Sequence, residues 1–166
     1  IADTGNNRIR KIDSSGNIST AIGSSFLTGS IDGFGTSLSI SSPKDIEIDS
    51  SDNIYFSEVG TNNLIRKYSS NFLSTIVGST SNPSAGDISS FASSSKLNYP
   101  VGITLDEANN YIYIADKLNH KIKRLNMSTS SVESLIGNVG QGDQDGDMSS
   151  GKVSYPHDMV IINDLN

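Results

Sequence analysis

Residues 111–125 read YIYIADKLNHKIKRL, and this stretch occurs three times in the chain. Residues 1–12, IADTGNNRIRKI, are a second copy, and residues 54–68, IYFSEVGTNNLIRKY, are a degenerate third. Each copy is a short apolar run that ends in an acidic residue, then a polar turn with Asn, then a basic and apolar run. The three copies therefore have one design, and their spacing decides how the chain is organised.

Three sets of residues recur with one period. They are the isoleucines in the basic run, the prolines that open the next apolar run and the glycines that close the unit: Ile9, Ile65 and Ile122; Pro43, Pro100 and Pro156; Gly23, Gly78 and Gly137. Successive isoleucines, and successive prolines, are 56 or 57 residues apart. A fixed period of this size predicts a repeat architecture in which each repeat is one supersecondary unit.

Each unit contains four short runs rich in Ile, Val, Leu, Tyr and Phe, bounded by Gly, Asn, Asp and Ser, which is typical of strands and turns. In the middle unit we expect strands near residues 45–49, 53–57, 64–68 and 73–77. The stretches between units are rich in Ser and Gly and predict long loops, at residues 24–42, 79–98 and 138–155. No helix longer than a single turn is expected, and that turn is near residues 88–93.

The repeated pattern resembles the NHL repeat. It reads Ile/Leu-Ala-Asp-x-x-Asn-x-Arg/Lys-Ile-Arg/Lys-Lys/Arg-Ile/Leu, and a Gly-ended strand, a loop with Asp-Gly and a Pro-led strand follow it. The Asp-Gly element stands at Asp32-Gly33 and Asp145-Gly146, and more loosely at Gly86-Asp87. The resemblance covers essentially the whole chain and implies a β-propeller, commonly of six blades. It leaves function open, because propellers host many activities on one scaffold.

We therefore predict an all-β protein, a β-propeller of four-stranded blades with about three blades present, which is half of a six-bladed ring. The incomplete domain spans residues 1–166, with strands two to four of a blade at 1–23, full blades at 43–78 and 100–137, and the first strand of a further blade at 156–163. The core should lie between blades, and an open half would expose apolar sheet faces. Additional sequence or a second copy would complete the ring; a three-bladed ring closed by strands from both ends is the alternative.

The acidic balance of the chain disfavours nucleic acid. The net charge is −6, and phosphates are bound mainly by basic groups. Eight of the twelve basic residues are nevertheless in the third strands: Arg8, Arg10, Lys11, Arg66, Lys67, Lys121, Lys123 and Arg124. A continuous rim of Arg8, Arg66 and Lys121 would support RNA binding. We favour the alternative that these bases pair with the repeat acids Asp3, Glu58 and Asp116.

Composition bears weakly on the compartment. No apolar stretch is long enough to span a bilayer, and there is no Cys to form disulfides. Glycosylation sequons begin at Asn17 and Asn126. The neutral, Ser-rich and Lys-poor surface favours an extracellular or secreted protein over a soluble cytoplasmic one.

The acid and Asn of the repeated turn are predicted to be structural. Asp3 with Asn6, and Asp116 with Asn119, can accept backbone N–H groups and stabilise tight turns. Because they recur in each unit, they are weak candidates for catalysis.

Residues that break the repeat are better candidates for a site. His120 and His157 are the only histidines, and neither has a counterpart in the other units. Some propeller lyases and hydrolases that this fold resembles hold a metal in the central channel, and His157, Asp158 and Asp45 could approach such a channel. Two histidines are weak support for zinc, which favours three or four protein ligands.

The stretch at residues 142–147 is the candidate calcium loop. Asp143, Asp145 and Asp147 place carboxylates at alternate positions beside Gly, as calcium loops do. The acid that closes an EF-hand loop is missing, since Ser154 stands at that position. No other cofactor is indicated.

Three functions follow. The first is a non-catalytic interaction or scaffold module with a protein partner or self-association, in which the loops at residues 24–42 and 79–98 make the contacts. It is favoured because no nucleophile, base and orienting group form a recognisable set. The second is a metal-dependent lyase or hydrolase whose site is shared with further blades. The third is an RNA-binding NHL domain.

Overall fold

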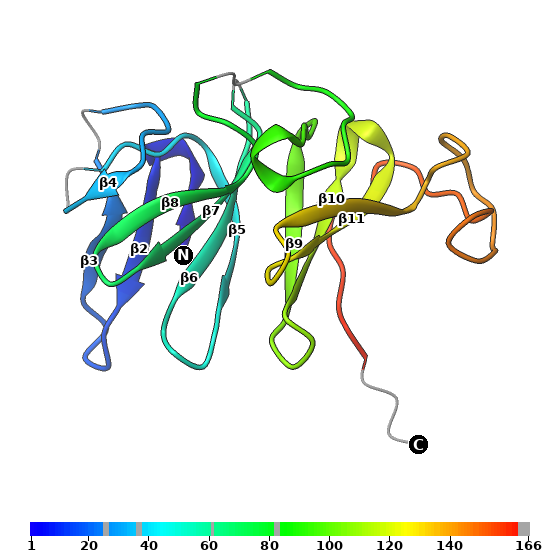
Figure 1. The fold of residues 1–166 in the computed structure, drawn as a ribbon. Helices are drawn as coiled ribbons and strands as arrows, with labels where there is room; N and C mark the ends of the chain where they lie inside the picture. Colours follow the sequence, from blue (N-terminus) through cyan, green and yellow to red (C-terminus); the bar gives the residue numbers. More distant parts are fainter. Residues whose placement is uncertain (25–26, 36–37, 61, 82–83, 163–166) are drawn as a thin grey trace.

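The computed structural model describes residues 1–24, 27–35, 38–60, 62–81 and 84–162, and these form three antiparallel sheets (Figure 1). The first sheet contains β1 (Ala2–Asp3), β2 (Arg8–Ile12) and β3 (Ile18–Gly23). The second contains β4 (Gly33–Phe34), β5 (Pro43–Ile48), β6 (Ile54–Glu58), β7 (Leu64–Ser69) and β8 (Phe72–Val77). The third contains β9 (Pro100–Asp106), β10 (Tyr111–Asp116), β11 (Lys121–Asn126) and β12 (Ser131–Ile136).

Helical structure in the described residues is limited to single 3₁₀ turns. They are η1 (Thr4–Asn6), η2 (Ala92–Ser94) and η3 (Lys117–Asn119). The sequence predicted a turn close to η2. No helix in this part of the chain is long and apolar enough to cross a membrane.

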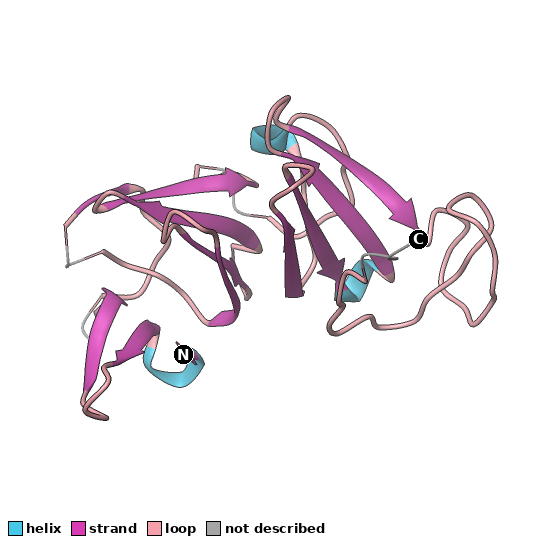
Figure 2. Cartoon of the chain, turned by 90° about the horizontal axis from the view of Figure 1, so that it is seen from below, coloured by secondary structure: helices cyan, strands magenta, loops and turns pink. Residues whose placement is uncertain are grey.

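The hydrophobic core lies between the sheets, as the sequence predicted. The middle sheet stands between the other two, so that the three follow one another as blades (Figure 2). Ile9 and Ile22 of the first blade pack with Phe56 and Leu73 of the second. Between the second and third blades the buried residues are Tyr55, Ile65, Val77, Ala92, Leu97, Ile103, Ile112, Ile114, Leu125 and Val132. This arrangement of sheets is that of part of a β-propeller.

One irregularity of register recurs in all three blades. The third and fourth strands pair Ile9 with Ile22, Ile65 with Val77 and Ile122 with Ile136, and the register shifts immediately after each pair. A glycine follows each fourth-strand member. Gly23 has φ +92°, and an added Cβ would lie 2.4 Å from the carbonyl oxygen of Asn7. Only glycine fits such a close approach at positive φ, which explains why glycine closes each unit.

The four strands predicted for the middle unit are present within two residues of the expected bounds. This sheet has a fifth strand in addition to the four that were predicted. Gly33 and Phe34 of the preceding long loop pair with Leu73 and Phe72 as an added outer strand. The fourth strand has a free edge on that side, and the loop is long enough to return along it.

The first strand of a further blade expected at residues 156–163 stays a prediction. Residues 156–162 have no strand partner, and residue 163 lies outside the described residues. The segment lies beside β9, where the Thr104 hydroxyl donates to the Met159 carbonyl oxygen at 2.7 Å. A first strand needs the second strand of its own blade to form its ladder, and none follows in the described part of the chain.

The three-bladed closure is also absent from the described residues. β1 pairs only with β2, and the first and third sheets lie on opposite sides of the middle one (Figure 2). Half of a six-bladed ring stays a prediction.

The recurrent isoleucines give a test of the blade packing. Ile65 is fully buried, but Ile122 is only half-buried, because no sheet among the described residues covers that side of the third blade. We expect Ile65→Asp to lower the free energy of unfolding by about 4 kcal/mol, and Ile122→Asp by less than half as much. Urea unfolding measures both, with Ile31→Asp, at an exposed loop residue, as the control. Equal losses for Ile65 and Ile122 would contradict the assigned packing.

Candidate functional site

Each blade carries an acid at the end of its second strand that pairs with a base on its third strand. The pairs are Asp3 with Arg10 at 3.6 Å, Glu58 with Arg66 at 2.9 Å, and Asp116 with Lys123 at 3.1 Å. In the second and third blades both side chains are fully buried. A buried charge is costly unless it is paired, so each acid compensates the charge of the base on the neighbouring strand.

The loop from the preceding blade adds a second acid to two of these bases. Asp32 accepts from Arg66 at 2.9 Å, and it also accepts from the backbone N–H and hydroxyl of Thr75. Asp87 lies 3.0 Å from Lys123 and 2.7 Å from Lys121. The long loops are therefore attached at fixed points to the blade that follows them.

Glu58 has the most perturbed environment of these acids. Burial raises the pKa of Glu58 to about 7, although Arg66 and the hydroxyl of Ser30 favour its ionised form. Burial likewise raises the pKa of Asp116, against the opposing effect of Lys123. The carboxylates of Glu58 and Asp116 are both buried from solvent and are paired with Arg66 and Lys123.

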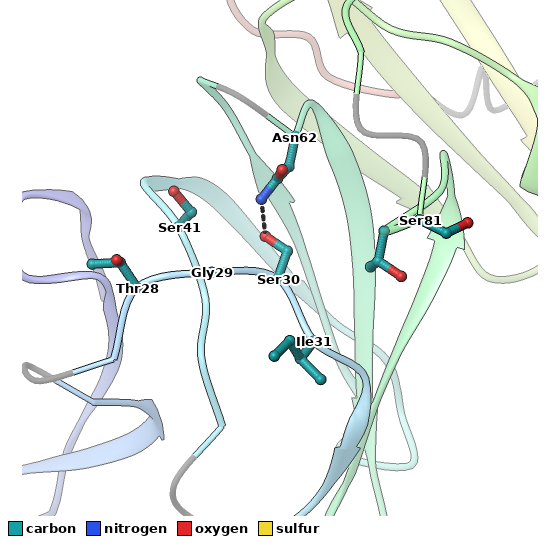
Figure 3. A pocket seen from close by; sticks show the side chains of 8 residues that line it. Thr28, Gly29, Ser30, Ile31, Ser41, Asn62 and Ser81 are labelled. Carbon is teal, nitrogen blue, oxygen red and sulfur yellow. Dashed lines mark hydrogen bonds between the residues drawn. The ribbon is translucent and has the colours of Figure 1, made fainter.

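A pocket of about 440 Å³ has Ser30, the hydrogen-bond partner of Glu58, in its lining (Figure 3). Its described lining residues are Thr28, Gly29, Ser30, Ile31, Ser41, Asn62, Thr80 and Ser81. Ser30 donates to Glu58, and the Asn62 amide donates to the Ser30 hydroxyl at 2.6 Å. The lining is thus hydroxyl and amide groups with one aliphatic side chain, connected through Ser30 to the buried ion pair.

The sequence did not single out Ser30 or Asn62. Its only signal was that the loops at residues 24–42 and 79–98 would supply contacts, and both loops contribute to this pocket. Their convergence on Asn62, which belongs to the turn between β6 and β7, depends on how the blades pack.

His120, which appeared to break the repeat, has the role of a repeat residue. Its Nδ1 accepts the backbone N–H of Tyr155 at 3.2 Å, just as the Asn7 and Asn63 side chains accept from Ser42 and Tyr99. All three acceptors have left-handed φ between 50° and 55°. Each ties the turn after the second strand to the residue before the next repeat proline.

His157, Asp158 and Asp45 do lie around one small cavity of about 130 Å³. The Asp45 carboxylate accepts the backbone N–H of Ile46 at 2.9 Å and of Ile103 at 2.8 Å, which links β5 to β9. Asp158 accepts the N–H of Met159. Among the described residues, no group of three or more His, Asp or Glu side chains is placed to hold a metal ion.

The acids of the predicted calcium loop are likewise not gathered into such a group in the residues described. Asp147 accepts from the backbone and hydroxyl groups of Ser149 and Ser150, and these bonds lower its pKa to about 2. Asp147 therefore caps a turn. Calcium binding by Asp143, Asp145 and Asp147 stays a prediction.

The remaining predicted residues occupy turns. Asn6 donates to Asp3 at 2.8 Å and Asn119 donates to Asp116 at 2.7 Å, each around a single 3₁₀ turn. Asn17 is exposed and its amide donates to Asp13. Asn126 is half-buried and accepts from the backbone of Ser128 and Thr129. Whether Asn17 and Asn126 are glycosylated stays a prediction.

The positive rim that would support RNA binding is not formed by the described residues. Arg66 is buried between Glu58 and Asp32, and Lys121 is paired with Asp87. These basic side chains instead form ion pairs within a blade or with the loop that precedes it.

Two curated proteins match part of the chain. NHL repeat-containing protein 2 from Homo sapiens is 38% identical over 52 residues, and the Bos taurus protein of the same name is 36% identical over 52 residues. These matches support an NHL-repeat family. The match covers 31% of this chain and only 7% of either relative, and no family model matches the chain.

The fold of this chain is also found in solved structures. A protein of unknown function from Bacteroides thetaiotaomicron has a TM-score of 0.64 at 19% identity, covering 80% of this chain and 30% of that one. An auxiliary nutrient binding protein from the same organism has a TM-score of 0.64 at 15% identity, covering 92% and 37%. At these identities the likeness establishes the fold alone.

The buried pair of Glu58 and Arg66 predicts a pH-dependent mutant. The variant Arg66→Met removes the cation beside Glu58, so the pKa of Glu58 in the folded state rises further. In the unfolded state the pKa of Glu58 stays lower, so the folded state keeps its proton to a higher pH than the unfolded state does. Stability is then present at low pH and lost as the pH rises through the folded pKa. We expect unfolding free energy to fall by about 3–5 kcal/mol near pH 8 and by less near pH 5.

Chemical denaturation at both pH values measures this effect. Lys67→Met, on the same strand but with its ammonium over the Tyr55 ring, is the control and should change little. If the loss in Arg66→Met is the same at both pH values, Glu58 is not the group responsible.

The acceptor role of His120 predicts that Asn can replace it. We expect His120→Ala to be less stable than His120→Asn by about 1 kcal/mol, because only Asn keeps an acceptor for Tyr155 and tolerates left-handed φ. Thermal unfolding of the two variants measures the difference. Equal stability would mean that the hydrogen bond contributes nothing.

Proposed function

We propose that this NHL chain is a non-catalytic propeller module that binds a protein partner through the face formed by its long loops, outside the cell. The observation that carries the proposal is the convergence of both loops on one pocket above the second blade (Figure 3). Because Asp32 and Asp87 attach the loops to the blades, the face is held in one shape before binding.

The use of the titratable residues supports a role without catalysis. The buried acids and bases pair within the blades, and the same pairing recurs in all three. The described lining of the pocket carries hydroxyl and amide groups, which bind by hydrogen bonding. A related fold in a nutrient binding protein is consistent with a binding module, although it says nothing of the ligand here.

The metal-dependent enzyme is the second candidate. It rests on the single observation that His157, Asp158 and Asp45 surround one cavity beside the first strands. It is less favoured because backbone N–H groups already occupy carboxylate oxygens of Asp45 and Asp158.

The test compares two faces of the molecule. Thr28 and Thr80 are exposed in the loop face, and Thr28→Arg/Thr80→Arg should abolish capture of a partner from an extracellular protein extract by the immobilised chain. Ser51→Arg/Ala108→Arg changes exposed turns at the opposite end of the blades and should leave capture intact (Figure 1). Equal capture by both variants would refute the assignment of the loop face.

A further inference from the structure

A second pocket, of about 470 Å³, lies between the second and third blades. Its described lining shares no residue with the pocket between the long loops. Most of that lining is aliphatic, aromatic or methionine, whereas the other pocket is lined by hydroxyl and amide groups. The volume and the apolar character are those of sites that hold one small molecule.

Backbone hydrogen bonds to both blades form one wall of this pocket. The N–H of Ala92 donates to the carbonyl oxygen of Ser130 at 2.8 Å, and the N–H of Gly78 donates to the carbonyl oxygen of Ala92 at 2.9 Å. Phe91 forms a β-bridge with Ser131. The loop before the third blade is therefore attached both to the outer strand of that blade and to the end of the second blade, which holds this wall in place.

The apolar surface of the pocket extends from buried to exposed residues. Tyr55 and Leu125 are buried in the core between the two blades and also line the pocket. Met127 is half-buried, and Phe91 is 69% exposed. An aromatic ring and a methionine side chain are good contacts for the aromatic body of a ligand.

The described lining contains one charged residue, Lys67. Its ammonium lies 5.1 Å from the centroid of the Tyr55 ring, and no ion pair involves it among the residues described. The carboxylate of Asp49 accepts from the Tyr55 hydroxyl at 3.0 Å and from the Asn53 amide at 2.8 Å, and it is not within ion-pair distance of Lys67. The pocket thus presents an unneutralised positive charge.

The repeat shows that this charge is specific to the second blade. Arg124 is the counterpart of Lys67, and it pairs across the sheet with Glu133, whose carboxylate lies 2.5 Å from its guanidinium. Lys67 pairs instead with Ser74, whose hydroxyl donates to the backbone carbonyl oxygen of Lys67 at 3.3 Å. The second blade therefore keeps the cation without the acid that neutralises it in the third blade.

We infer that the pocket between the second and third blades binds a small carboxylate with an aromatic body. The carboxylate pairs with the ammonium of Lys67, and the ring packs against Phe91 and Met127. A charge-assisted hydrogen bond beside an apolar surface favours an amphipathic anion over a neutral molecule of the same shape. This inference is independent of any partner on the loop face.

The test uses 2-naphthoate, with 2-naphthamide as a neutral probe of nearly the same shape. Isothermal titration calorimetry of the 166-residue chain measures both affinities. We expect 2-naphthoate to bind about tenfold more tightly than 2-naphthamide, because only the carboxylate forms an ion pair with Lys67. A chain that binds both probes equally, or binds neither, would overturn the inference.

Two variants separate the charge from the apolar surface. Lys67→Met should weaken 2-naphthoate about tenfold and leave 2-naphthamide unchanged, because it removes the ammonium and keeps an apolar side chain. Phe91→Ser should weaken both probes, and the exposure of Phe91 makes this change tolerable for folding. Circular dichroism checks that each variant is folded. Unchanged binding of 2-naphthoate by a folded Lys67→Met variant would refute the assignment.

Lys44→Met is the matched control. Lys44 is also half-buried, and its ammonium lies 5.9 Å from the centroid of the Tyr99 ring, but it does not line this pocket. This variant should bind 2-naphthoate as the wild type does, and a loss equal to that of Lys67→Met would place the anion elsewhere and overturn the inference. Thr28→Arg/Thr80→Arg should likewise keep 2-naphthoate binding, so the outcome at the loop face is read separately.

Discussion

The structure depends on one constraint, which is that a four-stranded sheet with two apolar faces cannot bury both of them alone. Each blade must have a neighbour on either side, and the buried clusters of this chain accordingly lie between sheets and not within them. The middle blade has two neighbours and is the best buried. Within the described residues the outer blades each have one neighbour, and their other faces carry exposed or half-buried isoleucines at positions that are buried elsewhere.

Polar contacts set how the blades meet. Asn7, Asn63 and His120 each accept one backbone N–H before the next repeat proline, and Asp45 joins the first strands of two blades. Buried ion pairs such as Glu58 with Arg66 carry a large desolvation cost, so their contribution is better read as selecting one arrangement than as adding stability. Ser30 donates a hydrogen bond to Glu58 and also lines the pocket between the loops, so the buried ion pair is connected to that pocket.

The repeat explains where the candidate site could be predicted and where it could not. Asp3, Asn6, Asp116 and Asn119 recur, and their turn geometry is local, so their structural role was visible from spacing. His120 misled because residue identity differs while the accepted hydrogen bond is the same as for Asn63. Ser30 and Asn62 are ordinary loop residues, and only the packing of two loops over the second blade brings them together.

The sequence by itself determined the period, the strands and the glycine that closes each unit, because strand propensity and turn chemistry act over a few residues. The tertiary structure alone decided which of the equivalent residues are buried. Ile65 and Ile122 occupy the same position of the repeat, yet one is fully buried and the other is not. The burial of a side chain on a blade face depends on which residues pack against that face. Those residues belong to the neighbouring blade, so the local sequence of one repeat does not determine it.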